Sequence, residues 1–210
     1  PDDEVRVTTK QAKKFLFHAA MKDKAAPGVF GWSAQLLIAI RGQKKKGRHV
    51  AFISQLARLE ARIANAQVCT EAAYVLTCGG LTAMNKLNPE EQEERAAAGQ
   101  APKLRPVNGG CALLKWAFQM AMSHPLPKAA IAQLEPIQKG LNCKFGIQAV
   151  GHYCRALYEM GHAILTTDFT NGFNAMLRQA MLDAINRRCP SLNSLFGKFY
   201  SISSWCFFKV

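Results

Sequence analysis

The chain has 210 residues, 49% of them hydrophobic, which is enough for a real core in one large domain or two small ones. Its 27 Lys and Arg residues against 14 Asp and Glu give a formal net charge of +13, which favours a polyanionic partner, nucleic acid or an anionic surface, over a basic protein without one. No uncharged apolar run approaches the length of a membrane span and no signal peptide is visible, which argues against membrane and secreted classes. Because the first residue is Pro1 rather than Met, we expect a piece of a longer protein.

Residues 1–65 are predicted to be helical and cationic. Pro27 and two glycines make a turn, after which Trp32 begins an apolar helix. The run over residues 41–48 carries five positive charges and two glycines. It is either a solvated loop or a functional segment, meaning a phosphate contact or a nuclear import signal.

A second part covers residues 66–161. It contains an expected helix over residues 112–122 and, before it, a well-marked short helix. Asn88 is a good cap, Pro89 suits the first helical position, and Gly99 ends the helix. The glutamates of this helix are predicted to form a solvated face rather than a metal cluster; they are Glu90, Glu91, Glu93 and Glu94.

The stretch from residue 101 to residue 166 has a strong charge bias, since only Glu135 and Glu159 oppose its cations. Aromatic side chains interleave with these cations, a pattern that suits a groove for a nucleic-acid strand, although each aromatic taken singly also fits a core position. We expect nucleic-acid contacts from Lys115, Lys139, Lys144 and Arg155. The aromatics concerned are Trp116, Phe118, Phe145 and Tyr153.

Residues 162–210 form the third part and contain the most informative segment. A short apolar run ends at Asp168, an Asn171-Gly172 turn follows, and Phe173 precedes an amphipathic pattern. This predicts a strand over residues 163–168 and a helix from residue 174 to about residue 187.

Seven cysteines are scattered along the chain without a C-x-x-C pair, and no His lies at zinc-ligand spacing from two of them. An odd, scattered set predicts reduced, mostly buried thiols in a reducing compartment, so we assign them neither a metal nor catalysis.

Residues 168–174, D-F-T-N-G-F-N, resemble the first catalytic motif of reverse transcriptases in its non-LTR retrotransposon form, D-F-x-N-A-F-N. Only Gly172 departs from it. Residues 103–107, K-L-R-P-V, resemble the K-x-R-P-I fingers motif, and residues 27–32 resemble the P-G-x-x-G-W entry to the fingers.

Further matches precede and follow the Asp168 segment. Residues 138–140 resemble the family's Q-x-G, and His152 with Arg155 fits its H-x-x-R, but the acid expected after Gly-Ala is replaced by Gln148 and Ala149. Residues 200–204 resemble a Y-S-x-x-S segment. The linker between Lys86 and Arg105 is longer and more acidic than the family's short turn, which we interpret as a surface insertion.

The resemblance implies an α+β fold: an incomplete right-hand polymerase with helix-rich fingers and the first palm strand and helix. It also implies roles for single residues. Asp168 would be catalytic and would bind the Mg²⁺ ions, of which the complete enzyme uses two; at most weak binding is expected here. Arg105, with help from Lys103, would hold the triphosphate, and Asn171 and Gly172 would lie beside the nucleotide.

Phe173 has two interpretations. In the family this aromatic lies beneath the sugar of the incoming nucleotide and leaves no room for a 2′ hydroxyl. Without the resemblance, a core Phe at a helix start is the simpler interpretation. The resemblance favours the sugar gate.

The function implied is RNA-templated DNA synthesis by two-metal nucleotidyl transfer, with an RNA template, a DNA primer and a deoxynucleotide triphosphate as partners. We expect this chain to be inactive alone, because the family's Asp-Asp pair should follow the Asp168 motif. Of the five Asp residues of the chain, only Asp183 follows it. An intracellular location, nuclear or cytoplasmic, goes with that function. The alternatives are a truncated relic that binds nucleic acid without catalysis, and a basic interaction protein in which the match is chance.

Overall fold

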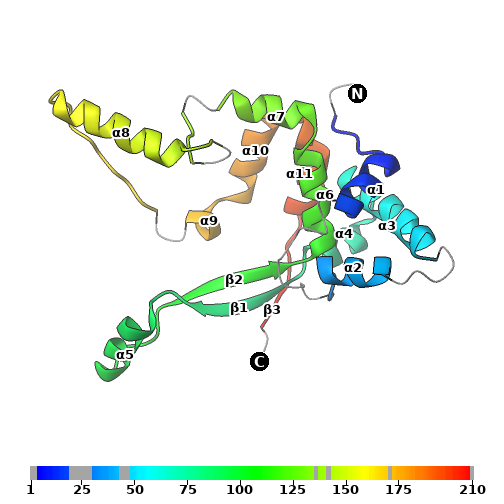
Figure 1. Cartoon of the computed structure of the whole chain (residues 1–210), viewed down its shortest axis with the longest axis horizontal. Helices are drawn as coiled ribbons and strands as arrows, with labels where there is room; N and C mark the ends of the chain where they lie inside the picture. The colour runs from blue at the N-terminus through cyan, green and yellow to red at the C-terminus, as the bar shows by residue number, and fades with distance from the viewer. Residues whose placement is uncertain are drawn as a thin grey trace. The chain divides into compact units, whose positions relative to one another are not determined.

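A computed structural model describes residues 4–18, 30–42, 48–134, 137–140, 143–169 and 172–208. Within these ranges the chain combines many helices with one small three-stranded sheet, as the expected α+β class requires (Figure 1). It divides into two compact units. We call Arg6–Ala121 with Ser194–Val210 the ribbon unit, and Pro1–Val5 with Met122–Asn193 the Asp168 unit. The three-part division made from composition stays a prediction.

The ribbon unit has a helical body and a projecting arm. Its helices are α1 (Thr9–His18), α2 (Ala34–Gly42), α3 (Arg48–Ala64), α4 (Thr70–Thr77), α5 (Pro89–Ala97), α6 (Ala112–Met122) and α11 (Asn193–Tyr200), the last two reaching the boundary between the units. Its strands are β1 (Gly79–Asn85), β2 (Leu104–Gly110) and β3 (Cys206–Phe208). The predicted helix over residues 112–122 is confirmed as α6.

Local signals explain where the first helices begin. Thr8 and Gln11 form a reciprocal cap, in which the Gln11 amide donates to Thr8 Oγ1 at 3.2 Å and the Thr8 amide donates to Gln11 Oε1 at 2.8 Å. Ser33 caps α2 by accepting from the Leu36 amide at 3.2 Å. The helix expected at Trp32 therefore begins two residues later, and Trp32 stacks on Phe52 of α3 with ring centroids 6.4 Å apart.

The core of the ribbon unit lies among its helices. Leu16 of α1, Ile53 of α3 and Trp116 of α6 are fully buried, and α1 packs on α3. Asn65, just after α3, ties down the first segment, because its side chain accepts from the Val7 amide at 2.8 Å and donates to the Val7 carbonyl at 2.9 Å. These contacts make the helical body the buried part of the ribbon unit.

The sheet has the order β2-β1-β3, with β1 antiparallel to β2 and parallel to β3. Strands β1 and β2 form a long two-stranded ribbon with α5 at its far end (Figure 1). The cap predicted at Asn88 is confirmed: its side chain accepts from the Glu91 amide at 2.8 Å, and the Glu91 carboxylate accepts from the Asn88 amide at 3.2 Å. Gly99 follows the helix at φ +64°, a conformation that favours glycine.

The Asp168 unit contains α7 (Pro125–Ala132), α8 (Gly146–Glu159), α9 (Gly172–Ala175), α10 (Arg178–Arg188) and the 3₁₀ turn η2 (Pro190–Leu192). The strand predicted over residues 163–168 is wrong, since residues 162–169 form neither helix nor strand. A strand needs a neighbour for its backbone groups, and none of the described strands lies in this unit. The helix predicted from residue 174 is present in two pieces that break at Met176 and Leu177.

The C-terminal apolar segment combines the end of a helix with a short strand. Tyr200 ends a helix, and only Cys206–Phe208 forms a strand, which pairs with β1. The side chains of Phe207 and Phe208 are exposed. In addition, no helix of the described ranges is both long and apolar enough to cross a membrane.

Glu60 of α3 is the one fully buried carboxylate among the described residues, with 0% of its surface exposed. Neither of its oxygens has a hydrogen-bond partner there. Burial raises the pKa of this carboxyl group well above its ordinary value. Burial also raises the pKa of the Cys111 thiol, and the Glu60 carboxylate adds to that effect, so the two groups share an apolar environment.

We expect the ribbon unit to lose stability as pH rises. A carboxyl group whose pKa is higher in the folded state contributes its full stabilisation at pH values below its unfolded-state pKa. This stabilisation is lost as the pH rises through the folded-state pKa. Glu60→Gln removes the titration and should raise the free energy of unfolding at alkaline pH by about 1–3 kcal/mol. Urea denaturation over a pH series measures it, with exposed Glu93→Gln as the control. An unchanged pH slope in Glu60→Gln would contradict the assignment.

Candidate nucleic-acid interface

The register of the ribbon decides which side chains share a face. Met84 pairs with Arg105 and Thr82 with Val107, and the Lys86 amide donates to the Lys103 carbonyl at 2.8 Å, which continues the same pairing by one step. Side chains alternate between faces along each strand, so Lys86, Lys103 and Arg105 lie on one face. We call this the cationic face. It also carries Thr82, Met84 and Val107.

The opposite face has no charge. Its residues are Leu81, Ala83, Asn85, Leu104, Pro106 and Asn108. Neither strand contains an Asp or a Glu. The ribbon therefore separates a basic face from a neutral one, although its sequence contains no long basic run.

Pro106 fits this ladder because of where the pairing places it. Hydrogen-bonded and non-hydrogen-bonded pairs alternate in an antiparallel ladder. Since the pair of Lys86 and Lys103 is bonded, the pair of Ala83 and Pro106 is not. In addition, β2 is an edge strand, so the missing N–H group of Pro106 removes no hydrogen bond from the sheet. The R-P-V motif is thus compatible with a regular strand.

The cationic face is electrostatically unbalanced. Lys86 and Lys103 stand directly opposite each other, an arrangement that destabilises a strand pair. None of the three ribbon cations forms an ion pair in the described part of the chain. Met84, which stands opposite Arg105, and Val107, the next residue of β2 on this face, are exposed beside them. A polyanion would relieve the repulsion while its apolar parts cover these two side chains.

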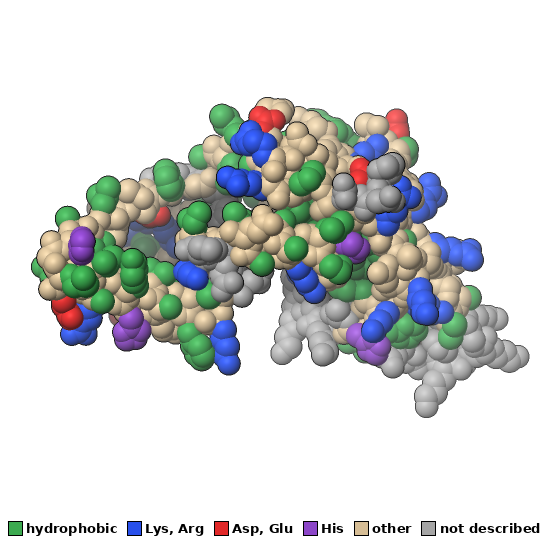
Figure 2. Space-filling model, turned by 90° about the horizontal axis from the view of Figure 1, so that it is seen from above, with side chains coloured by type: hydrophobic (Ala, Val, Ile, Leu, Met, Phe, Trp, Pro, Cys, Tyr) green, Lys and Arg blue, Asp and Glu red, His purple; other side chains and the backbone are tan. Residues whose placement is uncertain are grey.

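Figure 2 shows that this excess of positive charge extends beyond the ribbon. On the face it displays, Lys and Arg side chains stand at many points and Asp and Glu side chains at few. On this face basic side chains outnumber acidic ones, in line with the net charge of +13.

Asp168 lies in an exposed, irregular segment. Its Oδ1 accepts from the next backbone amide, that of Phe169, at 2.9 Å. The Gly172 amide, at the start of α9, donates to the Phe169 carbonyl at 3.3 Å. Exposed apolar side chains surround Asp168 in sequence, with Leu165 89% and Phe169 79% exposed. Asn171 and the side chain of Phe173 lie outside the described residues, so their predicted roles stay predictions.

The other predicted nucleic-acid contacts fall in both units. Lys115 is exposed on α6 of the ribbon unit, whereas Lys139, Lys144 and Arg155 belong to the Asp168 unit. Arg155 pairs with Glu159 at 3.0 Å, and Lys144 Nζ lies 5.1 Å from the Phe145 ring centroid. Both cations are exposed. The structure thus brings Lys103 and Arg105 together with Lys86 in the ribbon unit, whereas Asp168 belongs to the other unit.

The aromatic residues divide between the two interpretations left open by the sequence. Trp116 is fully buried, and Phe118 contacts Phe196, Phe199 and Tyr200 with centroids 5.0, 6.0 and 5.9 Å apart, so both are core residues. Phe145 and Tyr153 are exposed. Only this second pair can contact a partner.

The described residues do not form a two-metal site. Mg²⁺ is bound through oxygen ligands, and two ions need about three such side chains. No group of three or more His, Cys, Asp or Glu able to hold a metal occurs among them. The four glutamates of α5 are exposed, as predicted. Asp183 of α10 is exposed as well and accepts from Gln179 at 2.8 Å.

Gly146, the first residue of α8, lies close to the backbone of the Q-K-G segment over residues 138–140. A Cβ atom built on it would lie 1.8 Å from the backbone oxygen of Lys139, so only glycine allows this approach. The preceding residue, Phe145, has a left-handed φ of 60°. The Q-K-G segment therefore rests against the first turn of α8.

Comparison with models of known protein families, with curated proteins and with solved structures finds no match for this chain. The candidate site therefore rests on its own geometry and on the sequence motifs.

The register added one residue that the motifs did not include as a site residue. Lys86 belongs to the cationic face only because it pairs with Lys103, so a composition-based search could not find it. Alternation within the segment L-T-A-M-N-K was the available signal.

Gly146→Ala should destabilise the Asp168 unit by about 1–3 kcal/mol, because the new methyl group collides with a backbone oxygen rather than a movable side chain. Gly151→Ala is the matched control in the same helix. Its Cβ meets nothing within 4 Å, so it should stabilise by about 0.5–1 kcal/mol. Hydrogen exchange of the α8 amides measures both. Equal effects of the two substitutions would contradict the close approach.

Proposed function

We propose that the chain forms the fingers and the beginning of the palm of a reverse transcriptase of the non-LTR retrotransposon kind. Its partners would be an RNA template, a DNA primer and a deoxynucleotide triphosphate, in an intracellular setting, nuclear or cytoplasmic. The observation that carries this proposal is the cationic face. The residues of the fingers motif, Lys103 and Arg105, lie there on one strand of a hairpin, and Lys86 joins them from the other strand.

The chemistry of the face supports this assignment. Arg binds phosphate oxygens through a planar fork and Lys adds a point charge, so one Arg beside two Lys suits a triphosphate or a strand of phosphates. The ribbon is exposed along β2 and along the outer part of β1, which leaves it accessible to a large partner. A ribbon with so little buried surface also gains stability from a bound partner.

The Asp168 segment supports the same proposal in a different way. Residues 162–169 form no strand, but the exposed side chains of Leu165 and Phe169 are apolar surface that the neighbouring strands of a complete palm would cover. Asp168 would supply one carboxylate of the catalytic site, and the other carboxylates would come from a later Asp-Asp hairpin. On this proposal the 210-residue chain binds substrates but does not join them.

A second candidate is a nucleic-acid-binding protein without catalysis. It is favoured by one observation: the described residues contain no group of carboxylates able to hold metal ions. The two candidates share the cationic face and differ only in the role of Asp168.

A polymerase assay separates them. The chain alone should show no primer extension on an RNA template, whereas a longer polypeptide carrying it with the Asp-Asp hairpin should extend the primer. Asp168→Asn should abolish that extension, and Asp183→Asn, an exposed Asp on α10, should leave it intact. In the chain alone, Arg105→Ala should weaken triphosphate binding by about tenfold and template binding less.

Extension that survives Asp168→Asn would show that the catalytic carboxylate lies elsewhere. Equal losses of triphosphate and template binding in Arg105→Ala would remove the triphosphate role from that residue and leave a general phosphate contact.

A further inference from the structure

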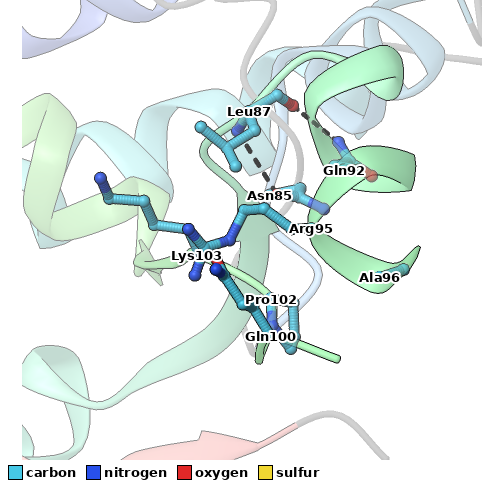
Figure 3. A pocket seen from close by; sticks show the side chains of 8 residues that line it. All are labelled: Asn85, Leu87, Gln92, Arg95, Ala96, Gln100, Pro102 and Lys103. Carbon is cyan, nitrogen blue, oxygen red and sulfur yellow. Dashed lines mark hydrogen bonds between the residues drawn. The ribbon is translucent and has the colours of Figure 1, made fainter. Parts of the chain in front are cut away.

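A small pocket lies at the far end of the ribbon, between the last residues of the hairpin and α5 (Figure 3). The helix contributes Gln92, Arg95 and Ala96 to its lining. The chain segments on either side of the helix contribute Asn85, Leu87, Gln100, Pro102 and Lys103. All of these residues belong to the ribbon unit, so the pocket is formed within one compact body.

Arg95 is held in place but not fully satisfied. One of its terminal nitrogens, Nη2, donates to the Ala101 carbonyl at 3.1 Å. Its Nε is buried and has no hydrogen-bond partner in the described part of the chain. A buried donor on a charged group without an acceptor is costly, so this nitrogen marks a place where an acceptor is missing.

The rest of the lining points to an anion as that acceptor. Lys103 brings a second positive charge, and no carboxylate lines the pocket. The four glutamates of α5 lie on other sides of the helix, where they are exposed, and the Glu91 carboxylate is already bonded to the Asn88 amide. Gln92 donates to the Leu87 carbonyl at 2.6 Å, which ties the helix to the segment that follows β1 (Figure 3).

Lys103 also connects the pocket with the cationic face, since it belongs to both. Two cations of the ribbon, Arg105 and Lys103, are therefore followed by a third, Arg95, on helix α5. Arginine with lysine is the combination that binds phosphate oxygens best, because the fork supplies directed donors and the ammonium group adds charge.

We propose that this pocket, formed by the inserted helix α5 and the end of the ribbon, is a binding site for a phosphate group held by Arg95 and Lys103. The phosphate is either free or part of a nucleic-acid strand that lies along the cationic face. Only the second source rests on the proposed function.

The first arm of the test uses inorganic phosphate with the intact 210-residue chain at constant ionic strength. The Nε–H signal of Arg95 in a nitrogen–proton NMR spectrum should shift and saturate. Lys103→Gln should weaken this binding by about tenfold, because it removes one charged partner while the bond from Arg95 to Ala101 stays intact. Arg95→Gln has no Nε–H signal, so its phosphate binding is followed by titration calorimetry, which should show that saturable binding is abolished. Exposed Arg58→Gln on α3 should leave binding unchanged in both measurements.

The second arm adds a short single-stranded oligonucleotide. If the phosphate belongs to a strand, the oligonucleotide should displace inorganic phosphate from Arg95; without competition, the strand as a source is wrong and free phosphate remains. The site itself is overturned if neither probe moves the Arg95 signal, or if Arg95→Gln binds both probes as tightly as the unmodified chain. Because inorganic phosphate needs no template, a failure of the polymerase proposal leaves the first arm unaffected.

Discussion

The register of β1 against β2 is the constraint on which the functional account depends. Side chains alternate along a strand, so a slip by one residue would move every side chain of one strand to the other face. In the observed register the three cations of the ribbon meet on one face and none lies on the other. The bond from the Lys86 amide to the Lys103 carbonyl continues that register to the point where the pocket begins.

The rest of the ribbon unit holds this arm at both ends. At the near end β1 pairs with β3, and the Gly79 amide donates to the Trp205 carbonyl at 3.0 Å. The Trp205 indole in turn donates to the Tyr74 hydroxyl of α4. At the far end α5 closes the hairpin through its capping box and the bond from Gln92 to Leu87. The part of the ribbon between these two ends is exposed along β2 and the outer part of β1. The two opposed lysines, Lys86 and Lys103, stand at the far end, where their like charges destabilise the strand pair.

Sequence reasoning succeeded where short-range signals decide the structure. The cap at Asn88, the glycine after α5 and the helix over residues 112–122 all follow from neighbouring residues. The site roles of Lys103 and Arg105, which come from a motif, stay predictions. Sequence reasoning failed where the outcome depends on distant partners. The strand expected before Asp168 finds no pairing strand among the described residues of its unit, and Lys86 joins the site only through the register. The burial of Glu60 depends on how α3 packs, which its own sequence does not reveal.

The central claim is that the cationic face binds nucleic acid, and the salt dependence of binding tests it most directly. Affinity for a short RNA–DNA hybrid should fall steeply with salt, and replacing one phosphate-contacting cation should reduce the slope of log K against log salt by about 0.7–0.9. Lys103→Gln and Arg105→Gln should each do so, whereas the exposed helical residues Lys14 and Arg58, replaced by Gln, should not. A slope that stays the same in both ribbon variants would contradict the account.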